Sequence, residues 1–348
     1  MEIVKLEHGS GGVEMHELLE KLIFRRVEDK LKRVGNGVGI DIPDDAAAIP
    51  TPDGKYLVVS VDSYTVNPIF FPGGNIGILA VSGTINDVLM MGGIPIAMLD
   101  TIVVEEGFPI RDLEIIIESM LKILREEEVA LVGGDFKVMP RGQVDKLVIT
   151  TTGIGIADKP IIDYPEPGDK IIVSDYIGDH GATILMLQMG VEKDVEKIFK
   201  SMIKSDVKPL TKLMKSLLTK HRDCITAARD PTRGGLAGVL NEWVRSRDFI
   251  VYLNENEIPI REPVKRFAET LGVDPLYLAS EGVAVLSIKE ECASDVIRYI
   301  WHLGFENARI IGEVRESRDI SGVIVAETSI GGLRIVEPPR GEIVPRIC

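Results

Sequence analysis

The sequence predicts an α+β protein made of two mixed α/β domains and an extended C-terminal tail. The chain has 348 residues, which at roughly 150 residues per domain suggests two domains. Strand-like and helix-like hydrophobic patterns alternate along it, and a stretch with three prolines, residues 157–169, interrupts them near the middle. We therefore expect domains over residues 1–157 and 170–336, a linker over 158–169 and a tail over 337–348.

The first half predicts strands over 55–63, 96–105 and 146–156, helices over 75–91 and 110–127, and a short strand over 129–136 that runs into a glycine turn. Its most apolar stretch, residues 64–99, carries Asp87 as its only formal charge. Repeated prolines and glycines break this stretch, so it predicts a buried helix that ends at Gly92 and not a membrane span.

The second half predicts strands over 170–174, 249–253, 282–288, 308–314, 321–327 and 332–336, and helices over 181–189, 195–203, 207–220, 261–271 and 290–303, with one more helix that opens at the glycine turn 230–235 and runs to Arg245. In the tail, Pro338, Pro339 and Pro345 exclude a helix and favour an extended arm that ends in Cys348.

Charge and cysteine usage narrow the function classes. The net charge of −14 and the absence of any Lys/Arg run argue against binding to nucleic acid or to an anionic membrane. The N-terminus has no apolar segment of the signal-peptide type, which predicts a cytoplasmic protein. Three cysteines without a CxxC spacing argue against disulfides and structural zinc, so we expect Cys224 and Cys292 to be buried thiols.

Several carboxylates follow or interrupt apolar elements in the first half. Any one of them has an ordinary interpretation as a cap or turn residue. Together they predict a magnesium–nucleotide site, because Mg²⁺ prefers oxygen ligands and nearby phosphates. The predicted metal ligands are Asp44, Asp45, Asp62, Asp87 and Asp135.

Glycine-rich segments supply candidate phosphate contacts, although neither a P-loop nor a Rossmann fingerprint is present. The predicted nucleotide contacts are His8, Gly9, Ser10, Gly11, Gly12, Asn86, Gly133, Gly134 and Thr232. The candidate catalytic residues are Cys348, Glu281, Lys137, Asp230 and Arg233. Arg233 precedes two glycines at a helix start, which suits phosphate, but a surface arginine is an equally ordinary interpretation.

The ordered set GSGG, DDAA, VDS, ND, GGD, DPTRGG and SEG resembles the aminoimidazole-ribonucleotide synthetase (PurM-like) superfamily. Its members are ATP-dependent and activate an oxygen by phosphorylating it. The final residues, PRIC, resemble the ending of the hydrogenase-maturation members of that superfamily. The match covers essentially the whole chain, and the ending is its most specific part.

The resemblance implies two PurM-like domains, with ATP and Mg²⁺ as cofactors. It implies that a carbamoyltransferase, HypF, loads a carbamoyl group onto Cys348, that ATP is used to dehydrate this group to a thiocyanate, and that the cyanide passes through a HypC–HypD complex to the iron of NiFe hydrogenase. It also implies a homodimer joined through the N-terminal domains, with ATP near that interface.

The residues suit this chemistry. An amide oxygen leaves poorly until a phosphoryl group is attached to it, and loss of phosphate then requires a base to remove N–H protons. Glu281 is the first candidate for the base and Asp230 the second, while Lys137 is a candidate to stabilise phosphoryl oxygens. Water must be excluded from the activated group, and a tail hinged at Gly341 supplies that closure.

Two alternatives remain open at this point. The first is a small-molecule kinase resembling thiamine-monophosphate kinase, which would have no use for a terminal cysteine. The second is a non-catalytic ATP-binding scaffold. Selenophosphate synthesis is disfavoured because the first glycine loop carries Ser10 where that enzyme would need a cysteine.

Overall fold

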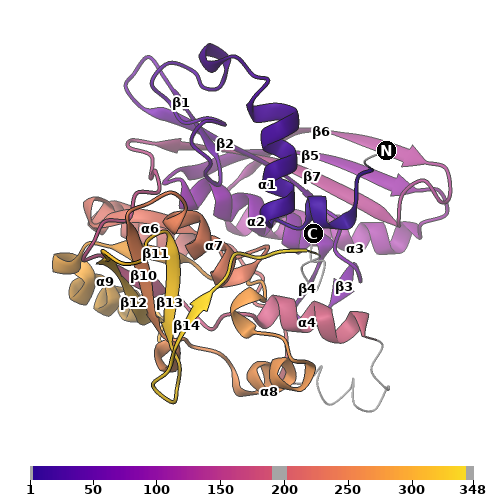
Figure 1. Ribbon diagram of the computed structural model, residues 1–348. Helices are drawn as coiled ribbons and strands as arrows, with labels where there is room; N and C mark the ends of the chain where they lie inside the picture. Colours follow the sequence, from indigo (N-terminus) through magenta and orange to yellow (C-terminus); the bar gives the residue numbers. More distant parts are fainter. Residues whose placement is uncertain (1–2, 190–201, 342–348) are drawn as a thin grey trace.

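A computed structural model describes residues 3–189 and 202–341 (Figure 1). Cys348 and nearly all of the helix expected over 195–203 lie outside the described residues. The described chain forms two main sheets, one built from strands between residues 47 and 157 and the other from strands between 170 and 336. This arrangement confirms the predicted fold class.

The first sheet has five strands in the order β1-β2-β7-β5-β6. They are β1 (Ala47–Pro50), β2 (Tyr56–Tyr64), β5 (Ile94–Glu105), β6 (Ala130–Met139) and β7 (Leu147–Ala157). All neighbouring strands are antiparallel except β5 and β6. The helices α2 (Ile76–Met90) and α3 (Ile110–Glu126) cover one face, which leaves the other face open (Figure 1).

Three expected strands and both expected helices of this half are confirmed. The strand over 129–136 is confirmed as part of β6, but the glycine turn is wrong, because the strand continues through Gly133 and Gly134. A Cβ on Gly134 would lie 2.0 Å from Asp100 Oδ1, so this glycine permits close approach of two strands and does not reverse the chain.

The residues before and around the first sheet form short elements that the sequence analysis does not predict. They are η1 (Leu6–Gly9), α1 (Val13–Leu19), η2 (Glu20–Phe24) and η3 (Asp29–Leu31), with a small two-stranded sheet of β3 (Phe70–Phe71) and β4 (Gly74–Asn75). Each is too short to carry a hydrophobic period, which is why pattern reading misses them.

The second sheet has seven strands in the order β14-β13-β10-β12-β8-β11-β9. They are β8 (Lys170–Val173), β9 (Ile225–Arg229), β10 (Phe249–Asn254), β11 (Val285–Ile288), β12 (Arg309–Glu316), β13 (Val323–Glu327) and β14 (Leu333–Val336). The helices are α4 (Asp179–Gln188), α6 (Thr211–His221), α7 (Gly235–Val244), α8 (Glu262–Leu271) and α9 (Glu290–His302), with the short turns η4 (Arg222–Cys224), η5 (Glu255–Glu257) and η6 (Pro275–Tyr277). All predicted elements of this half that lie within the described residues are present, while β9 was not expected.

Helices cover both faces of this second sheet. Alternate residues of β8 point to opposite faces. Ile172 therefore joins the core that includes α6 and α9, whereas Ile171 and Val173 pack with α7. The first of these cores also contains Leu79 and Ile85 from α2, so one hydrophobic core continues from the first sheet to the second.

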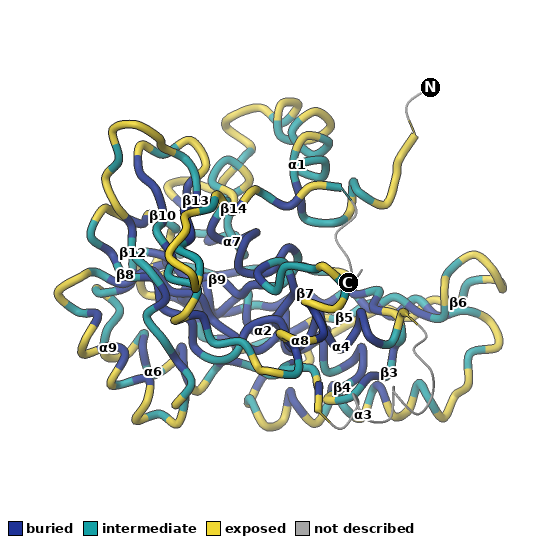
Figure 2. The backbone as a smooth tube through the Cα atoms, turned by 60° about the horizontal axis from the view of Figure 1, so that its bottom comes forward, coloured by how far each residue is buried: buried dark blue, intermediate teal, exposed yellow. Residues whose placement is uncertain are grey.

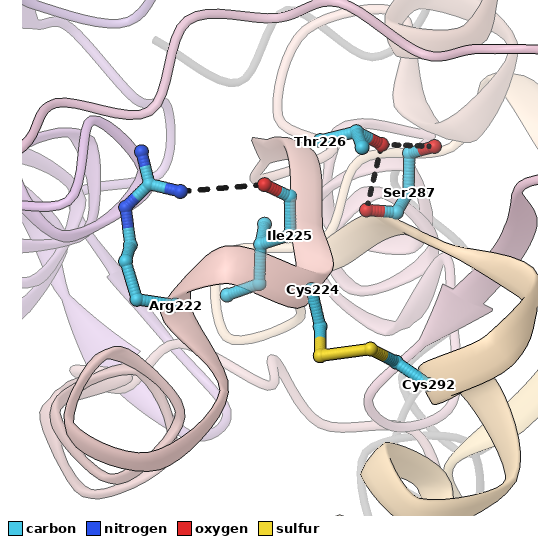
Figure 3. Close-up of a disulfide and its surroundings, with 6 residues drawn as sticks. All are labelled: Arg222, Cys224, Ile225, Thr226, Ser287 and Cys292. Atoms are coloured by element: carbon cyan, nitrogen blue, oxygen red, sulfur yellow. Dashed lines mark hydrogen bonds between the residues drawn. A yellow bond between two sulfur atoms is a disulfide. The ribbon is translucent and has the colours of Figure 1, made fainter.

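The expectation that Cys224 and Cys292 are separate thiols is wrong. They form a disulfide that joins η4 to α9, with a Cα–Cα distance of 5.9 Å (Figure 3). The two cysteines are 68 residues apart, and β9 and β11 bring them together as neighbouring strands. Spacing along the chain could not show this contact because it is made by the sheet.

Candidate active site

A cluster of buried and partly buried carboxylates lies on the seam between the two sheets. It joins Asp62 from β2 and Asp87 from α2 with residues of three loops, and α2 itself contacts α6 and β9 across the seam. Figure 2 shows α2 buried at the centre of the molecule. We call these residues the carboxylate cluster: Asp45, Asp62, Asp87, Asp230 and Glu281.

The members of the cluster perturb one another. Burial raises the pKa of Asp87 well above its usual range, and the charges of Asp230 and Asp62 raise it further. Burial likewise raises the pKa of Glu281, with added repulsion from Asp230. A group of acids that suppress one another's ionisation indicates a site prepared for positive charge.

Hydrogen bonds orient two members. The Ser60 hydroxyl donates to Asp87 Oδ2 at 2.6 Å, so that β2 fixes a carboxylate of α2. Asp62 accepts the Ser63 backbone N–H at 2.8 Å and lies 4.0 Å from Arg233. Arg233 therefore lies beside the cluster, and its predicted catalytic role stays a prediction.

The Asp44–Asp45 loop is held against the second sheet by Arg229, which is 8% exposed. Arg229 pairs with Asp45 at 2.6 Å and with Asp163 at 2.6 Å, and it donates to the Pro43 carbonyl. Burial and the Asp163 charge raise the pKa of Asp44 to about 7, against the opposing effect of Arg229. The arginine thus neutralises part of this loop and ties the first domain to β9.

The glycine loop of residues 8–12 and the glycine loop of residues 230–235 meet at the seam. The Arg233 guanidinium donates to the Gly9 carbonyl at 3.3 Å, and a Cβ on Gly11 would lie 2.8 Å from the Arg233 Cβ. In the second loop, the Thr232 N–H donates to the Asp230 carbonyl. His8 accepts the Lys5 N–H through Nδ1, and Ser10 donates to the Leu6 carbonyl.

Asn86 is fully buried, and its side-chain amide makes hydrogen bonds to other parts of the protein. Nδ2 donates to the carbonyls of Lys208 and Glu281, and Oδ1 accepts the Leu210 N–H at 2.8 Å. These bonds link α2 to the second half of the chain. A direct nucleotide contact by Asn86 stays a prediction.

Asp135 and Lys137 do not join the carboxylate cluster. Both lie on the exposed edge strand β6, with Lys137 Nζ 2.8 Å from an Asp135 oxygen. Asp135 pairs in register with Thr101, and Thr101 with Thr150. One chain therefore presents the predicted site in two separate parts.

Among residues 3–189 and 202–341, no three acidic, histidine or cysteine side chains have the geometry of a finished metal site. The cluster nevertheless fits a hard divalent cation, because Asp45 Oδ2 and Asp230 Oδ2 are buried without a hydrogen-bond partner. Of the predicted metal ligands, Asp45, Asp62 and Asp87 belong to the cluster and would hold the ion, with Asp44 directly beside Asp45.

Sequence reasoning missed two residues that shape the site. Arg229 ends an apolar strand, and a buried charge there needs a partner, which was a usable signal. Asp206, whose Oδ1 accepts the Glu281 N–H at 3.1 Å, sits in an extended segment with no recognisable motif. Nothing in the sequence pattern marks it.

The tail leaves the fold beside these loops. The Val13 N–H donates to the Pro339 carbonyl at 3.2 Å, and the Gly341 N–H donates to Glu14 at 3.1 Å. Gly341 has a φ of 72°, the left-handed region that glycine adopts without strain. Figure 1 shows this segment running from β14 to the base of α1.

No described helix combines the length and the apolar character needed to cross a membrane. Residues 43–157 match the family profile "AIR synthase related protein, N-terminal domain", and residues 166–325 match "AIR synthase related protein, C-terminal domain". These two matches cover most of the chain.

Full-length relatives are also found. Carbamoyl dehydratase HypE of Azotobacter vinelandii is 40% identical over 349 residues, which cover 99% of this chain and 97% of that protein. A crystal structure of hydrogenase maturation protein HypE in complex with ATP is 38% identical, with a TM-score of 0.79, and covers 99% of this chain and 100% of that one. A chain of the HypE–HypF complex is 34% identical, with a TM-score of 0.81, and covers 94% of this chain and 100% of that one.

Proposed function

Because the chain belongs to the HypE family of hydrogenase maturation proteins, within the PurM-like superfamily, we propose that it is an ATP-dependent carbamoyl dehydratase that acts on its own C-terminus. It converts an S-carbamoyl group on Cys348 to a thiocyanate, which provides cyanide for the iron of NiFe hydrogenase. The observation that carries the proposal is that the tail leaves the fold beside the loop that joins Asp230 to α7 and that carries Arg233, a neighbour of Asp62 in the carboxylate cluster. A Cβ on Gly234, in the loop that follows Asp230, would lie 2.9 Å from Pro339.

Reach supports this assignment. Cys348 lies seven residues beyond Gly341, and an extended chain of seven residues spans at most about 25 Å. The tail starts at contacts with Glu14 and with the Arg233 loop. A hinge at Gly341 would therefore allow the terminal sulfur to approach the cluster.

The atoms of the reaction balance. The carbamoyl oxygen attacks the γ-phosphorus of ATP and ADP leaves. The nitrogen then loses its two protons, the C–O bond breaks to release phosphate with its bridging oxygen, and a C≡N bond forms on sulfur. We expect Arg233 to bind phosphoryl oxygens. Glu281, whose pKa is raised by burial and by the Asp230 charge, is the first candidate to take up a proton, and Asp230 is the second.

Mg²⁺, when bound, would neutralise charge that develops on the phosphoryl oxygens. The predicted ligands within the seam are Asp44, Asp45, Asp62 and Asp87. Arg229 already neutralises part of the charge on Asp44 and Asp45. Burial of α2, Asp230 and Glu281 limits the access of water to this side of the seam.

A homodimer would complete the site. The open face of the first sheet exposes Val61 and Leu99, which are both in register with Thr152, and it carries Asp135 and Lys137 of β6, which is typical of a surface covered by another chain. Pairing through this face would bring Asp135 and Lys137 of one copy toward the other, with the nucleotide near the interface. Gly133 and Gly134 would then contact phosphate.

We further propose HypF as the carbamoyl donor and a HypC–HypD complex as the acceptor of cyanide, in the cytoplasm. A relative of this chain is found in a complex with HypF, which supports the first partner. The homodimer, the thiocyanate chemistry and the HypC–HypD step rest on family membership and on the residues described above.

Intact mass measurement tests the proposal. The protein is incubated with HypF, carbamoyl phosphate and ATP, and compared with Cys348→Ala. We expect a gain of one carbamoyl group and then, with Mg-ATP, the loss of one water, neither of which occurs in the variant. An unmodified Cys348 with steady ATP turnover would contradict the proposal and direct the search to small phosphate acceptors.

A further inference from the structure

An irregular segment, residues 205–210, lies across the seam and connects both halves of the chain. The Ser205 N–H donates to the Pro72 carbonyl at 2.9 Å, and the Ser205 hydroxyl lies 2.8 Å from Nδ1 of the buried His180. A Cβ on Gly73 would clash with the Ser205 backbone, so this approach is close. We call residues 205–210 the crossing segment.

The crossing segment holds the peptide of Glu281 from both sides. The Glu281 N–H donates to Asp206 Oδ1 at 3.1 Å. The Glu281 carbonyl accepts the Lys208 N–H at 3.3 Å and Asn86 Nδ2 at 3.3 Å. A Cβ on Gly282 would lie 2.0 Å from the Asp206 carbonyl, so the next residue is pressed against the same segment.

Asn86 closes this arrangement from the side of α2. It donates to the carbonyls of Lys208 and Glu281 and accepts the Leu210 N–H, and these bonds engage both ends of its amide. The residue that follows it is Asp87, a member of the carboxylate cluster. One turn of α2 therefore supplies Asp87 to the carboxylate cluster and, through Asn86, holds the backbone of Glu281.

These hydrogen bonds to the Glu281 backbone oppose the electrostatic repulsion between Glu281 and the neighbouring carboxylates. Glu281 faces Asp230, Asp62 and Asp87, whose charges all disfavour its ionised form. Asp206 adds to this repulsion and is itself bordered by Asp179 and Lys208. A loop that carries Glu281 would relax away from like charges unless its backbone were fixed.

We propose that Asp206 and Asn86 are positioning residues, which fix the Glu281 backbone so that its carboxyl is held at the carboxylate cluster. This proposal rests on the role of Glu281 in the proposed function. Neither residue is required to touch the nucleotide or the carbamoyl group. Their effect is on the placement of the reacting base.

Matched substitutions separate the hydrogen bond from simple stability. Asp206→Asn keeps an oxygen that accepts the Glu281 N–H, whereas Asp206→Ala removes it. We expect Asp206→Ala to lower kcat for the dehydration by about 10- to 100-fold with little change in the KM for ATP, and Asp206→Asn to recover most of the rate. Asp179→Ala is the control, because it truncates a neighbouring buried carboxylate that pairs with Arg261 and does not hold Glu281.

A double-mutant cycle tests the route of the effect. In a Glu281→Gln background, Asp206→Ala should reduce the residual turnover by no more than about twofold, because a positioning residue acts only through the group it positions. An equal loss in both backgrounds would overturn the proposal. The proposal would also be overturned if Asp206→Asn were as inactive as Asp206→Ala.

Hydrogen exchange gives a readout that does not require activity. Peptides that contain residue 281 should exchange faster in Asp206→Ala and Asn86→Ala than in the wild type, and at the wild-type rate in Asp206→Asn and Asp179→Ala. Unchanged exchange in Asp206→Ala would overturn the proposal. If the wild type never loses water from a carbamoylated Cys348, or if Glu281→Gln is fully active, the proposed function fails instead. The hydrogen-exchange result does not depend on activity, so it still shows whether Asp206 and Asn86 fix the Glu281 backbone.

Discussion

The carboxylate cluster and the open face of the first sheet are opposite kinds of surface in one molecule. In the cluster, Asp87 and Glu281 are buried among groups of like charge. On the open face, Val61 is 66% exposed and Leu99 36% exposed, and Asp135 pairs with Lys137 in solvent. The cluster is packed by residues of the same chain, whereas the open face has no layer of residues over it among the described parts of the chain.

The difference shows how the proposed site is divided. The cluster is held by burial and by hydrogen bonds such as Ser60 to Asp87, so its geometry exists within a single chain. The residues of β6 have no such support, and a second copy would have to supply their surroundings. Substitutions should therefore act on the first region through charge and on the second through association.

The largest effect is expected for Asp87→Asn. It should lower ATP turnover by a factor of about a thousand, because the site loses a charge that faces the reacting groups. Thermal stability should stay the same or rise, since the substitution removes one of several mutually repelling acids. Turnover and melting temperature with and without Mg²⁺ would be measured, and Mg²⁺ should stabilise the wild type only. Equal stabilisation of both proteins by Mg²⁺ would argue against a role of Asp87 in holding the metal.

Val61→Glu should instead disrupt pairing of two copies through the open face. A charge on this exposed position adds a desolvation cost to pairing but removes no contact within one chain. We expect dimer to become monomer in sedimentation measurements, with turnover reduced about tenfold or more and the melting temperature of the monomer little changed. Ile330→Glu is the control, because Ile330 is 93% exposed on the other half of the molecule. A dimer that survives Val61→Glu would place the interface elsewhere.

Lys137→Ala should have a smaller effect, about tenfold on kcat, if the residue reaches phosphoryl oxygens across the interface. The lysine now pairs only with an exposed Asp135, so stability should not change. Steady-state kinetics would be compared with those of Lys122→Ala, an exposed lysine of α3. Equal activity of the two variants would remove Lys137 from the site.

The smallest effect concerns pH and stability. Burial raises the pKa of Asp206 to about 7 and that of Asp179 to about 6. The folded state thus binds protons that the unfolded state has released, so the stability from these groups is fully present below about pH 4 and is lost as the pH rises through about 6 to 7.

Urea unfolding at about pH 5 and about pH 8 should give a lower free energy of unfolding at the higher pH, and Asp206→Asn should reduce the difference. Asp135→Asn should not, because Lys137 lowers the pKa of Asp135, whose contribution is lost only at acid pH. A pH difference that Asp206→Asn leaves unchanged would mean that other groups produce it.

Particular residues show how far the sequence could lead. The helix over 75–91 was predictable because its composition and its terminal glycines act locally. The Asp230 and Glu281 motifs were recognisable as chemistry. The use of Asn86, however, depends on the carbonyls of Lys208 and Glu281, which are far away in sequence. The disulfide likewise depends on β9 lying beside β11.

The sequence by itself determined the two-part fold, most of its elements and the residue types of the site, because hydrophobic period, turn chemistry and motif order are local properties of the chain. Only the tertiary structure decided that Asp87 and Glu281 meet at the seam while Asp135 and Lys137 remain on an open sheet face. That division depends on which strands pair and which faces are covered, and these contacts join residues that no local pattern connects.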